Sequence, residues 1–469
     1  MLSNTAEFNK VEITVNFGES SAQKLPNDWT CRGVRVDSRA ITDGNLFIAL
    51  KGENTDGHNF VDMAFESGAS AAVVNQHWYR DNIEKYKDKH VIIVKDTLKA
   101  LGRLANLHRR RFDIPIVAIG GANGKTTTKD MMASVLAQKF NILKTYKNYN
   151  NQIGMPFMLL QLDESHQAAV LEIGTNEPGE IAILSEMLEP THGLITNIGK
   201  EHLEKLIDLD GVEMEETFLF GFLHKTNGVS FINMDDERLS KYQVIMENEF
   251  TYGTSNDEAM IIADISLNKE LNPLLTIRAD ERELKVQLST IGYASGLNAL
   301  AAASVGFHFG LSEDEIKSGL ESYKSAIGDG YGRMVFEDMG SYKVLNDCYN
   351  ANPDSMKMAF HTLKAVRSSG RKIAVLGDMR ELGEYALEEH KTVIQMAVEI
   401  SDLIYVFGKE MNKALRDFNR KDMINSYITK DDLLQDLIQQ IEDGDTILIK
   451  GSRGMAMEKI ITGLKKQTV

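Results

Sequence analysis

The chain has 469 residues, of which 43% are hydrophobic and 26% charged, and its formal net charge is −16. This length exceeds what one hydrophobic core usually supports, so the sequence predicts two or three domains of an ordinary globular protein and excludes a disordered or fibrous chain. The excess of acidic residues argues against a broad nucleic-acid-binding surface, which requires clustered lysines and arginines.

The opening stretch "MLSNTAEFNKVEITVNFGES" lacks the basic-then-apolar layout of a secretory signal, and no apolar run approaches membrane-spanning length. We therefore expect a cytoplasmic protein without membrane insertion. The 2 cysteines, Cys31 and Cys348, lie far apart and predict neither a disulfide framework nor a zinc site. The basic run "HRRRF" (108–112) ends an expected helix, where cations suit the helix dipole; an anion-binding patch is the alternative.

The first 110 or so residues indicate an irregular α/β segment, and a regular pattern begins at about residue 114. From there, short β-rich runs alternate with helical stretches, which predicts mostly parallel sheets with helices on their faces. The expected strands lie within 114–121, 168–174, 192–199 and 228–233, with a helix from about Lys125 to Phe140 and an antiparallel hairpin within 274–289.

The alternation of strands and helices restarts near residue 342, which indicates a separate domain. Its expected strands are 342–347, 371–378, 402–408 and 445–451. This spacing is typical of a doubly wound α/β fold. The glycine-rich stretch "AIGDGYGRM" (326–334) precedes it and predicts a hinge, near Gly328 to Gly332, about which the domains close.

The stretch "GGANGKTTT" (120–128) predicts a phosphate-binding loop between a strand and a helix. The usual pattern G-x-x-x-x-G-K-[ST] would require a glycine where Ile119 stands, so this loop is one residue short. Its context still fits: backbone N–H groups and a helix N-terminus attract phosphate, Lys125 would contact the phosphates, and the Thr126 hydroxyl would bind Mg²⁺. A plain turn with a lysine at a helix start is the alternative.

Two further polar residues follow strand ends, at the edge where open α/β sheets bind ligands. Glu172 closes the strand "VLEIG", where a carboxylate serves either as a magnesium ligand or as a cap of the next helix. His202 follows the strand in "TNIGKEHLE", and a packed or surface histidine is the alternative to a ligand.

Taken in order, these residues resemble the Mur ligase family. That family's phosphate loop has the shortened form G-[TS]-N-G-K-[TS], which "GANGKT" (121–126) matches except at Ala122. Further matching blocks span the chain, at 36–74, 148–160, 171–184, 195–204, 346–356, 376–383 and 448–458. The resemblance implies three domains: a UDP-substrate domain (1–112), a central P-loop ATPase domain with a mostly parallel sheet (113–326) and a C-terminal Rossmann-like ligase domain (327–469).

The resemblance implies an ADP-forming amide ligase that requires ATP and Mg²⁺ and works in peptidoglycan precursor synthesis. The terminal carboxylate of a UDP-MurNAc-tripeptide would attack the γ-phosphate of ATP, and the amine of D-Ala-D-Ala would attack the resulting acyl phosphate. Both first reactants are anionic, so Lys125 and Mg²⁺ would screen their charge. We expect a monomer, although the sequence leaves the oligomeric state and the third residue of the tripeptide open.

The same resemblance implies the role of each site residue. Lys125, Glu172 and His202 would be catalytic, and Thr126, Glu172 and His202 would serve the magnesium sites. The implied ATP contacts are Gly121, Ala122, Asn123, Gly124, Lys125, Thr126, Thr127, Asn298 at the adenine, Arg333 and Asp347. The implied substrate contacts are Ser38 and Arg39 at the uridine, Asn150 and Asn151 at the sugar-peptide, and Asn350, Asn352 and Lys450 facing the incoming amino component.

Several of these residues have structural alternatives. Asn298 could face outward from an apolar helix, and "YNANP" (349–353) could only start a helix, since asparagine caps and proline opens helices. Arg333 could be a hinge residue, and Lys450 a cation at a strand end.

Five residues depart from the family pattern near the expected chemistry: Gly120, Ala122, Glu201, Glu216 and Ser295. Glu201 replaces a small residue, and Glu216 stands where most relatives carry a lysine that becomes carbamylated. We expect Glu216 to supply that negative charge directly as a metal ligand; a solvated helix face with Glu213 and Glu215 is the alternative. The departures leave open a ligase joining a different carboxylate and amine in another pathway, or a nucleotide-binding homologue with reduced activity.

Overall fold

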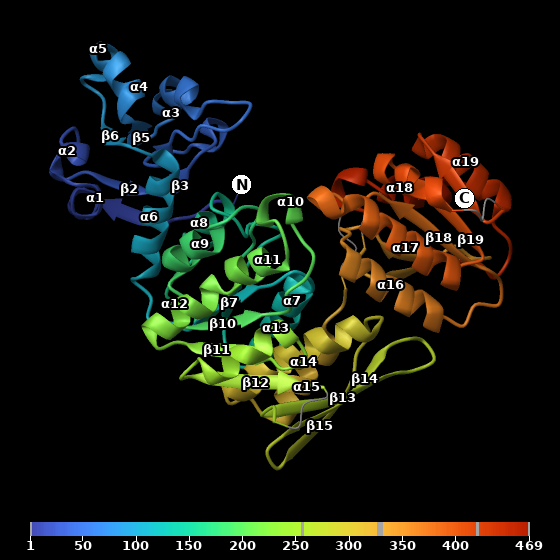
Figure 1. The fold of residues 1–469 in the computed structure, drawn as a ribbon. Coiled ribbons are helices and arrows are strands. Elements are labelled where there is room, and N and C mark those ends of the chain that lie inside the picture. Colours follow the sequence, from blue (N-terminus) through green and yellow to red (C-terminus); the bar gives the residue numbers. More distant parts are fainter. Residues whose placement is uncertain (1, 255–257, 326–331, 419–421, 468–469) are drawn as a thin grey trace. The chain divides into compact units, whose positions relative to one another are not determined.

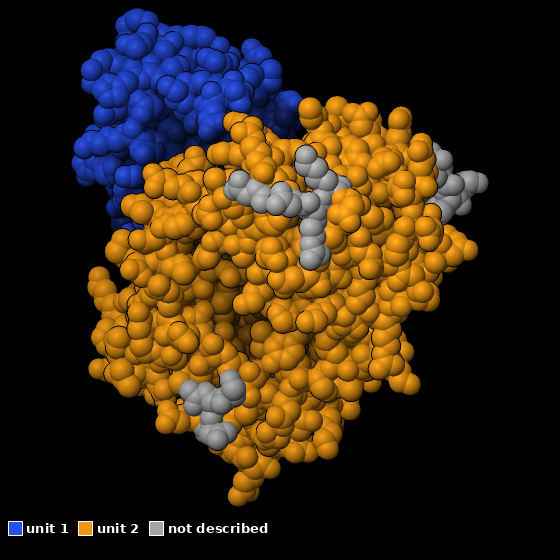
Figure 2. Space-filling model, turned by 45° about the vertical axis from the view of Figure 1, so that its right-hand side comes forward, with its two compact units in different colours: residues 1–118, 140–174, 179–192 blue, residues 119–139, 175–178, 193–469 orange. Residues whose placement is uncertain are grey.

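A computed structural model describes residues 2–254, 258–325, 332–418 and 422–467. The chain divides into two compact units, coloured separately in Figure 2. Unit 1 comprises residues 1–118, 140–174 and 179–192, and unit 2 comprises 119–139, 175–178 and 193–469. The expected domain boundary at 326/327 and most of the expected hinge, residues 326–331, lie outside the described residues; Gly332 is described.

Unit 1 contains a parallel four-stranded sheet in the order β3-β4-β5-β6 and a two-stranded antiparallel sheet, β1-β2 (Figure 1). The strands are β1 (Glu7–Asn9), β2 (Thr30–Arg32), β3 (Val34–Arg35), β4 (Leu46–Ile48), β5 (Ala71–Asn75) and β6 (Val91–Val94). The helices are α1 (Lys10–Phe17), α2 (Glu19–Ala22), α3 (Val61–Glu66), α4 (Gln76–Asp81), α5 (Ile83–Tyr86) and α6 (Thr97–Arg109). Apolar side chains of β4, β5 and β6 pack on Val61, Ala64 and Tyr79 to form the core of the parallel sheet.

The basic run at the end of α6 is structural. Arg109 is buried and donates to the carbonyls of Leu188, the last residue of α9 (Glu180–Leu188), and of Glu189, its C-cap, while Arg110 pairs with the Glu189 carboxylate. The run does end a helix, as predicted, and its arginines contact protein groups, Arg111 pairing with Glu12. Unit 1 also holds α8 (Gly154–Leu159) and the parallel pair β8 (Ile142–Lys144) and β9 (Ala168–Glu172).

Two strands, β7 (Ile116–Gly120) and β10 (His192–Ile195), run across the division between the units. In unit 2, β11 (Val229–Asn233), β12 (Glu249–Gly253) and β13 (Ile261–Leu267) pair in parallel, and β14 (Pro273–Ala279) and β15 (Arg282–Gln287) continue them as an antiparallel hairpin. The helices of this part are α7 (Lys125–Leu136), α10 (Leu203–Leu206), α11 (Leu209–Glu216), α12 (Phe218–Thr226), α13 (Glu237–Ser240), α14 (Tyr293–His308) and α15 (Glu313–Ser322). Helices α14 and α15 both pack against α7.

The C-terminal part of unit 2 is a six-stranded sheet in the order β16-β17-β21-β18-β19-β20 (Figure 1). Its strands are β16 (Val335–Asp338), β17 (Lys343–Asp347), β18 (Lys372–Gly377), β19 (Leu403–Phe407), β20 (Ile424–Tyr427) and β21 (Thr446–Lys450), all parallel except β16. The helices are α16 (Pro353–Ala365), α17 (Ala386–Ile400), α18 (Lys409–Ala414), α19 (Lys430–Gln440) and α20 (Glu458–Gln467). Side chains on one face pack on α16, α17 and α18, and those on the other on α19 and α20, as in a doubly wound fold.

The expected strands are all present, and their bounds agree within two residues except for β10, which ends at Ile195, four residues before the predicted end at 199. The helix predicted from Lys125 to Phe140 is shorter, because residues 138 and 139 donate to carbonyls three residues back and form turns that end α7 at Leu136. No helix within the described ranges is long and apolar enough to cross a membrane.

Candidate active site

The loop between β7 and α7 is held by two glycines and by Asn197. Gly121 and Gly124 have φ of +108° and +83°, and an added Cβ would lie 2.3 Å from Thr196 Oγ1 and 2.4 Å from Asn298 Oδ1, respectively. The backbone N–H groups of Ala122 and Asn123 donate to the carbonyl and side chain of Asn197, at 2.9 and 3.1 Å. The loop is therefore braced before any ligand arrives.

Lys125, the first residue of α7, lies against a carboxylate. Its Nζ donates to the Gly121 carbonyl and to Glu201 Oε2, the latter at 3.2 Å. The side chains of Lys125 and Glu201 are only 15% and 8% exposed. The second oxygen of Glu201, Oε1, is buried and has no hydrogen-bond partner within the described residues.

Glu216 lies at the same loop and is fully buried. Its Oε2 accepts the Gly121 N–H at 2.7 Å, and its Oε1 has no partner in the described part of the chain. Burial raises the Glu216 pKa to about 7, against the favourable charge of Lys125. The solvated-face alternative is wrong: Glu213, Glu215 and Glu216 are 8%, 1% and 0% exposed, because α11 turns them inward.

His202 connects the loop region to the C-terminal part of unit 2. Its Nδ1 lies 2.7 Å from Glu381 Oε2 and its Nε2 lies 3.9 Å from Glu201 Oε2. Burial opposes protonation, but the hydrogen bond to Glu381 and the charges of Glu201 and Glu381 outweigh it and raise the His202 pKa. His202 is thus neither a packed core group nor an exposed one.

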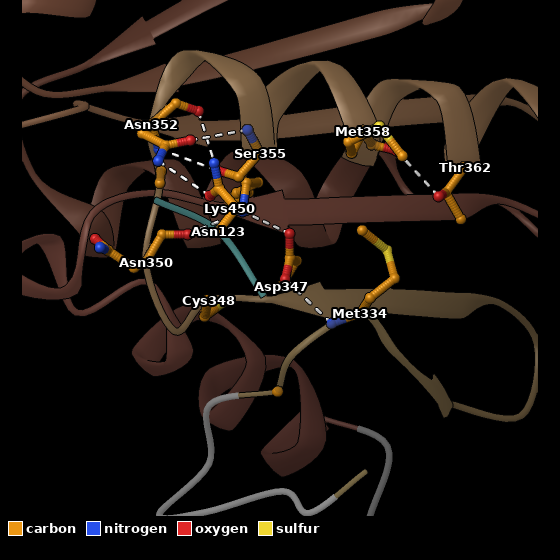
Figure 3. Close-up of polar contacts among 12 residues, drawn as sticks. Asn123, Met334, Asp347, Cys348, Asn350, Asn352, Ser355, Met358, Thr362 and Lys450 are labelled. Carbon is orange, nitrogen blue, oxygen red and sulfur yellow. Dashed lines mark hydrogen bonds and ion pairs between the residues drawn. The ribbon is translucent and has the colours of Figure 1, made fainter. Parts of the chain in front are cut away.

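Asn352 also joins these two parts of unit 2. Its Oδ1 accepts the Ser355 N–H at 2.8 Å and caps α16, while its Nδ2 donates to Asn123 Oδ1 at 3.0 Å (Figure 3). "YNANP" is therefore a helix start that also touches the phosphate loop. Nearby, Lys200 donates from its N–H to Asp354 at 3.0 Å and pairs with Glu389 at 2.6 Å.

A second polar group lies at the ends of β17 and β21. Lys450 is 2% exposed, and its Nζ donates to Asp347 Oδ2 at 2.5 Å and to the Asn350 carbonyl at 2.8 Å (Figure 3). Asp347 Oδ1 accepts the Met334 N–H at 3.1 Å. The Arg333 guanidinium lies 3.5 Å from the centre of the Tyr349 ring. Asp347, Asn350 and Lys450 are thus brought together.

Asn298 lies beneath the start of α7, where its Oδ1 accepts from the Thr128 hydroxyl at 3.2 Å. It is half-buried, so the outward-facing alternative is wrong. Ser295, one turn earlier on α14, is buried and bonds with Thr290.

In unit 1, Glu172 is 4% exposed at the end of β9. Its Oε1 accepts from Asn150 Nδ2 at 3.0 Å, and its Oε2 is buried without a partner in the described residues. It does not cap a helix. Asn151 instead accepts the N–H groups of Ile153 and Gly154 at the start of α8.

The two residues expected at the uridine, also in unit 1, face different ways. Ser38 is buried with its Oγ 3.3 Å from Met63 Sδ, whereas Arg39 is exposed and its guanidinium donates two hydrogen bonds to the Asp37 carboxylate, at 2.9 and 2.8 Å. Arg35, Asp37 and Thr42 line a cavity of about 180 Å³ beside them.

The carboxylate and hydroxyl oxygens beside the loop suit a hard cation whose remaining ligands would be phosphate and water oxygens. Within the described ranges, no three His, Cys, Asp or Glu side chains form a complete metal site. Glu201 and Glu216 nevertheless each hold a buried carboxylate oxygen without a partner, next to the loop. Carboxylate and hydroxyl oxygens together with substrate phosphates are the ligands that Mg²⁺ prefers.

The sequence did not predict the hydrogen bonds by which Asn197 holds the loop. It also did not predict the contacts of Glu381 with His202, or of Asp354 and Glu389 with Lys200. Asn197 lies in the stretch "TNIG" (196–199), but nothing in its spacing indicates that its side-chain oxygen accepts a hydrogen bond from the loop. Glu201 was visible only as a departure from the family pattern.

Three family models match the chain. They are described as the Mur ligase family, catalytic domain (residues 30–109), the Mur ligase middle domain (119–306), and the Mur ligase, glutamate ligase domain (332–453).

Named relatives and solved structures match nearly the whole chain. A UDP-N-acetylmuramoyl-tripeptide–D-alanyl-D-alanine ligase of Bacillus subtilis is 35% identical, over 92% of this chain and 93% of its own length. The ligase of that name from Escherichia coli is 32% identical, over 94% and 95%. The crystal structure of MurF from Acinetobacter baumannii superposes with a TM-score of 0.87 at 27% identity, covering 99% and 100% of the two chains. MurF from Thermotoga maritima, solved in complex with ADP, gives 0.82 at 25% identity, covering 93% and 97%.

Proposed function

Because this chain belongs to the Mur ligase family, we propose that it is an ATP-dependent, ADP-forming ligase that joins D-Ala-D-Ala to a UDP-MurNAc-tripeptide in peptidoglycan precursor synthesis. The observation that carries the proposal is the braced loop at 121–126, with Lys125 at a helix start beside buried carboxylates, in a chain similar to such ligases over 92% of its length.

Lys125 is the residue proposed to contact the transferring phosphate. Its position on the first turn of α7 adds the helix dipole to its own charge, and both attract an anion. The loop N–H groups already bonded to Asn197 and Glu216 fix the backbone shape, so little reorganisation is needed when the nucleotide binds. Asn298, Arg333 and Asp347 complete the proposed ATP contacts.

Mg²⁺ is part of the proposal, with Thr126, Glu172, His202 and Glu216 as the residues that would hold it. Bound Mg²⁺ would screen the charge of the phosphates and of the attacking carboxylate. The unpartnered oxygens of Glu172 and Glu216 support this role, because a buried carboxylate oxygen without a partner is costly unless a cation or donor reaches it.

The roles of the residues expected to contact the two substrates are also part of the proposal. Ser38 and Arg39 are proposed for the uridine, Asn150 and Asn151 for the sugar-peptide, and Asn350, Asn352 and Lys450 for the amino component. The family models at 30–109, 119–306 and 332–453 each fall inside one of the proposed domains 1–112, 113–326 and 327–469. A cytoplasmic monomer is proposed with them, since ATP and nucleotide-linked sugars are cytoplasmic substrates.

The test is ADP release by the purified protein. We expect release that requires both UDP-MurNAc-tripeptide and D-Ala-D-Ala, and we expect Lys125→Ala to lower kcat at least about 100-fold, because a charge at the transferring phosphate is lost. Lys139→Ala, which removes an exposed lysine just beyond the same helix, is the matched control.

A panel of tripeptides and amines separates the outcomes. Turnover only with a different carboxylate and amine would assign the alternative ligase, and ATP binding without turnover on any pair would assign the homologue of reduced activity. Undiminished ligation by Lys125→Ala would remove the phosphate role from this loop.

A further inference from the structure

In this structure Lys125, the cation of the predicted phosphate loop, already forms an ion pair with Glu201. Lys125 Nζ lies 3.2 Å from Glu201 Oε2, and both side chains are largely buried. Electrostatic attraction is stronger in such a place than at a solvated surface, because the local dielectric is lower. An arriving phosphate must therefore compete with Glu201 for Lys125.

If Lys125 turns to a bound phosphate, Glu201 loses its ion-pair partner. His202 also lies near Glu201, with its Nε2 3.9 Å from Glu201 Oε2, but its Nδ1 already pairs with Glu381 at 2.7 Å. A charged Glu216 attracts Lys125 but repels Glu201, so it adds to the negative charge that Lys125 balances. Transfer of Lys125 to a phosphate would thus leave two buried carboxylates facing an anionic ligand.

Both carboxylates already hold one oxygen ready for a further partner. Glu201 Oε1 and Glu216 Oε1 are buried and have no hydrogen-bond partner within the described residues. A divalent cation would satisfy both oxygens and offset the charge that Lys125 no longer balances. A small side chain at position 201 would create neither the competition nor the uncompensated charge.

Resting on the proposed function, we propose that Glu201 is a positioning residue that couples nucleotide binding to the divalent cation. It holds Lys125 in the empty site and penalises nucleotide that arrives without the cation. ATP then binds tightly only when the cation accompanies it.

The test compares ATP affinity with and without Mg²⁺, by isothermal titration calorimetry in the absence of acceptor and amine. The variant is Glu201→Ala, which places at this position the small residue that the family resemblance implies. We expect Glu201→Ala to tighten ATP binding in EDTA at least tenfold and to lower the ratio of the Kd in EDTA to the Kd in Mg²⁺ at least tenfold. Glu213→Gln is the matched control, because Glu213 is also 8% exposed and ion-paired, but with Arg238 and Lys241.

Two further variants keep the outcomes separate. Glu201→Gln retains the volume of the side chain and is used if thermal unfolding shows that the alanine variant does not fold. Failure of the wild type to bind ATP with Mg²⁺, or full binding by Lys125→Ala, would overturn the proposed function itself. Normal wild-type binding with an unchanged Mg²⁺ ratio in both Glu201 variants would overturn only the role of Glu201.

Discussion

Glu216 combines complete burial, a hydrogen bond from the Gly121 N–H and a free second oxygen. The family resemblance implies a carbamylated lysine at this position, where this chain has a glutamate. A glutamate can carry the charge directly; burial raises its pKa to about 7, and a cation beside it would favour the ionised form.

We therefore predict that ligation by this protein is insensitive to removal of carbon dioxide and bicarbonate. Glu216→Gln should lower kcat about 10–100-fold, the usual effect of losing a charged group that orients a metal. Glu213→Gln on the same helix serves as control. Stimulation of the wild type by bicarbonate would mean that a carbamylated lysine elsewhere supplies the ligand.

At this scale the sequence predicts which residues carry charge but not what they contact. The order glycine, lysine, threonine at a helix start predicts Lys125, and the family resemblance, counted from His202, singles out Glu216. The pairing of Lys125 with Glu201 follows from how residues 199–204 fold back on the loop, and 76 positions separate the two partners. Such a contact has no local signal.

At the scale of elements, the N-terminus of α16 contacts the phosphate loop. Asn352 caps the helix with its side-chain oxygen and bonds Asn123 with its side-chain nitrogen. The oxygen of the Asn352 amide therefore stabilises the helix start, while its nitrogen holds the loop, and the two roles can be tested separately.

Asn352→Asp should keep the cap, because its carboxylate still accepts the Ser355 N–H, but lose the donor to Asn123. We expect a thermal unfolding midpoint near that of the wild type, with a raised KM for ATP. Asn352→Ala should show the raised KM and also lose about 1 kcal/mol of stability. Equal KM values for Asn352→Asp and the wild type would contradict a role for this contact.

The segments preceding β18 and β21 are joined by a buried ion pair. Asp445, whose side chain is 1% exposed, accepts the Arg371 N–H and its guanidinium, each at 2.8 Å. Burial raises the Asp445 pKa, but these bonds and the Glu442 N–H outweigh it, and the pKa is lowered.

A lowered folded-state pKa makes the stabilisation complete above the unfolded value, about 3.9, and lost as the pH falls through the folded value. Asp445→Asn should therefore cost about 1.5–3 kcal/mol at pH 7, measured by urea unfolding. The difference from the wild type should shrink as the pH falls below about 4. A difference that is the same at pH 7 and pH 3 would show that packing, not charge, sets the cost.

At the scale of the whole molecule, strand periodicity predicts the α/β class and the doubly wound C-terminal sheet. It misses the two edge strands of that sheet, β16 and β20, because "VFED" and "INSY" are short and only half-buried and lack a continuous apolar run. The contacts of Glu381, Glu389 and Asn352 with the loop region depend on how the C-terminal part of unit 2 folds against 193–204, which no local pattern specifies.

The unpartnered oxygens of Glu201 and Glu216 beside the loop favour a synthetic inhibitor that carries a positive charge, rather than the usual negative one. Compounds aimed at nucleotide sites are normally given phosphate mimics, and here such an anion would meet Glu201 and Glu216 once Lys125 is engaged. An amidine or amine placed to reach both oxygens would instead pair with them. A homologue with a small residue at position 201 would lack one of these charges, so selectivity for this protein would come from the two carboxylates together.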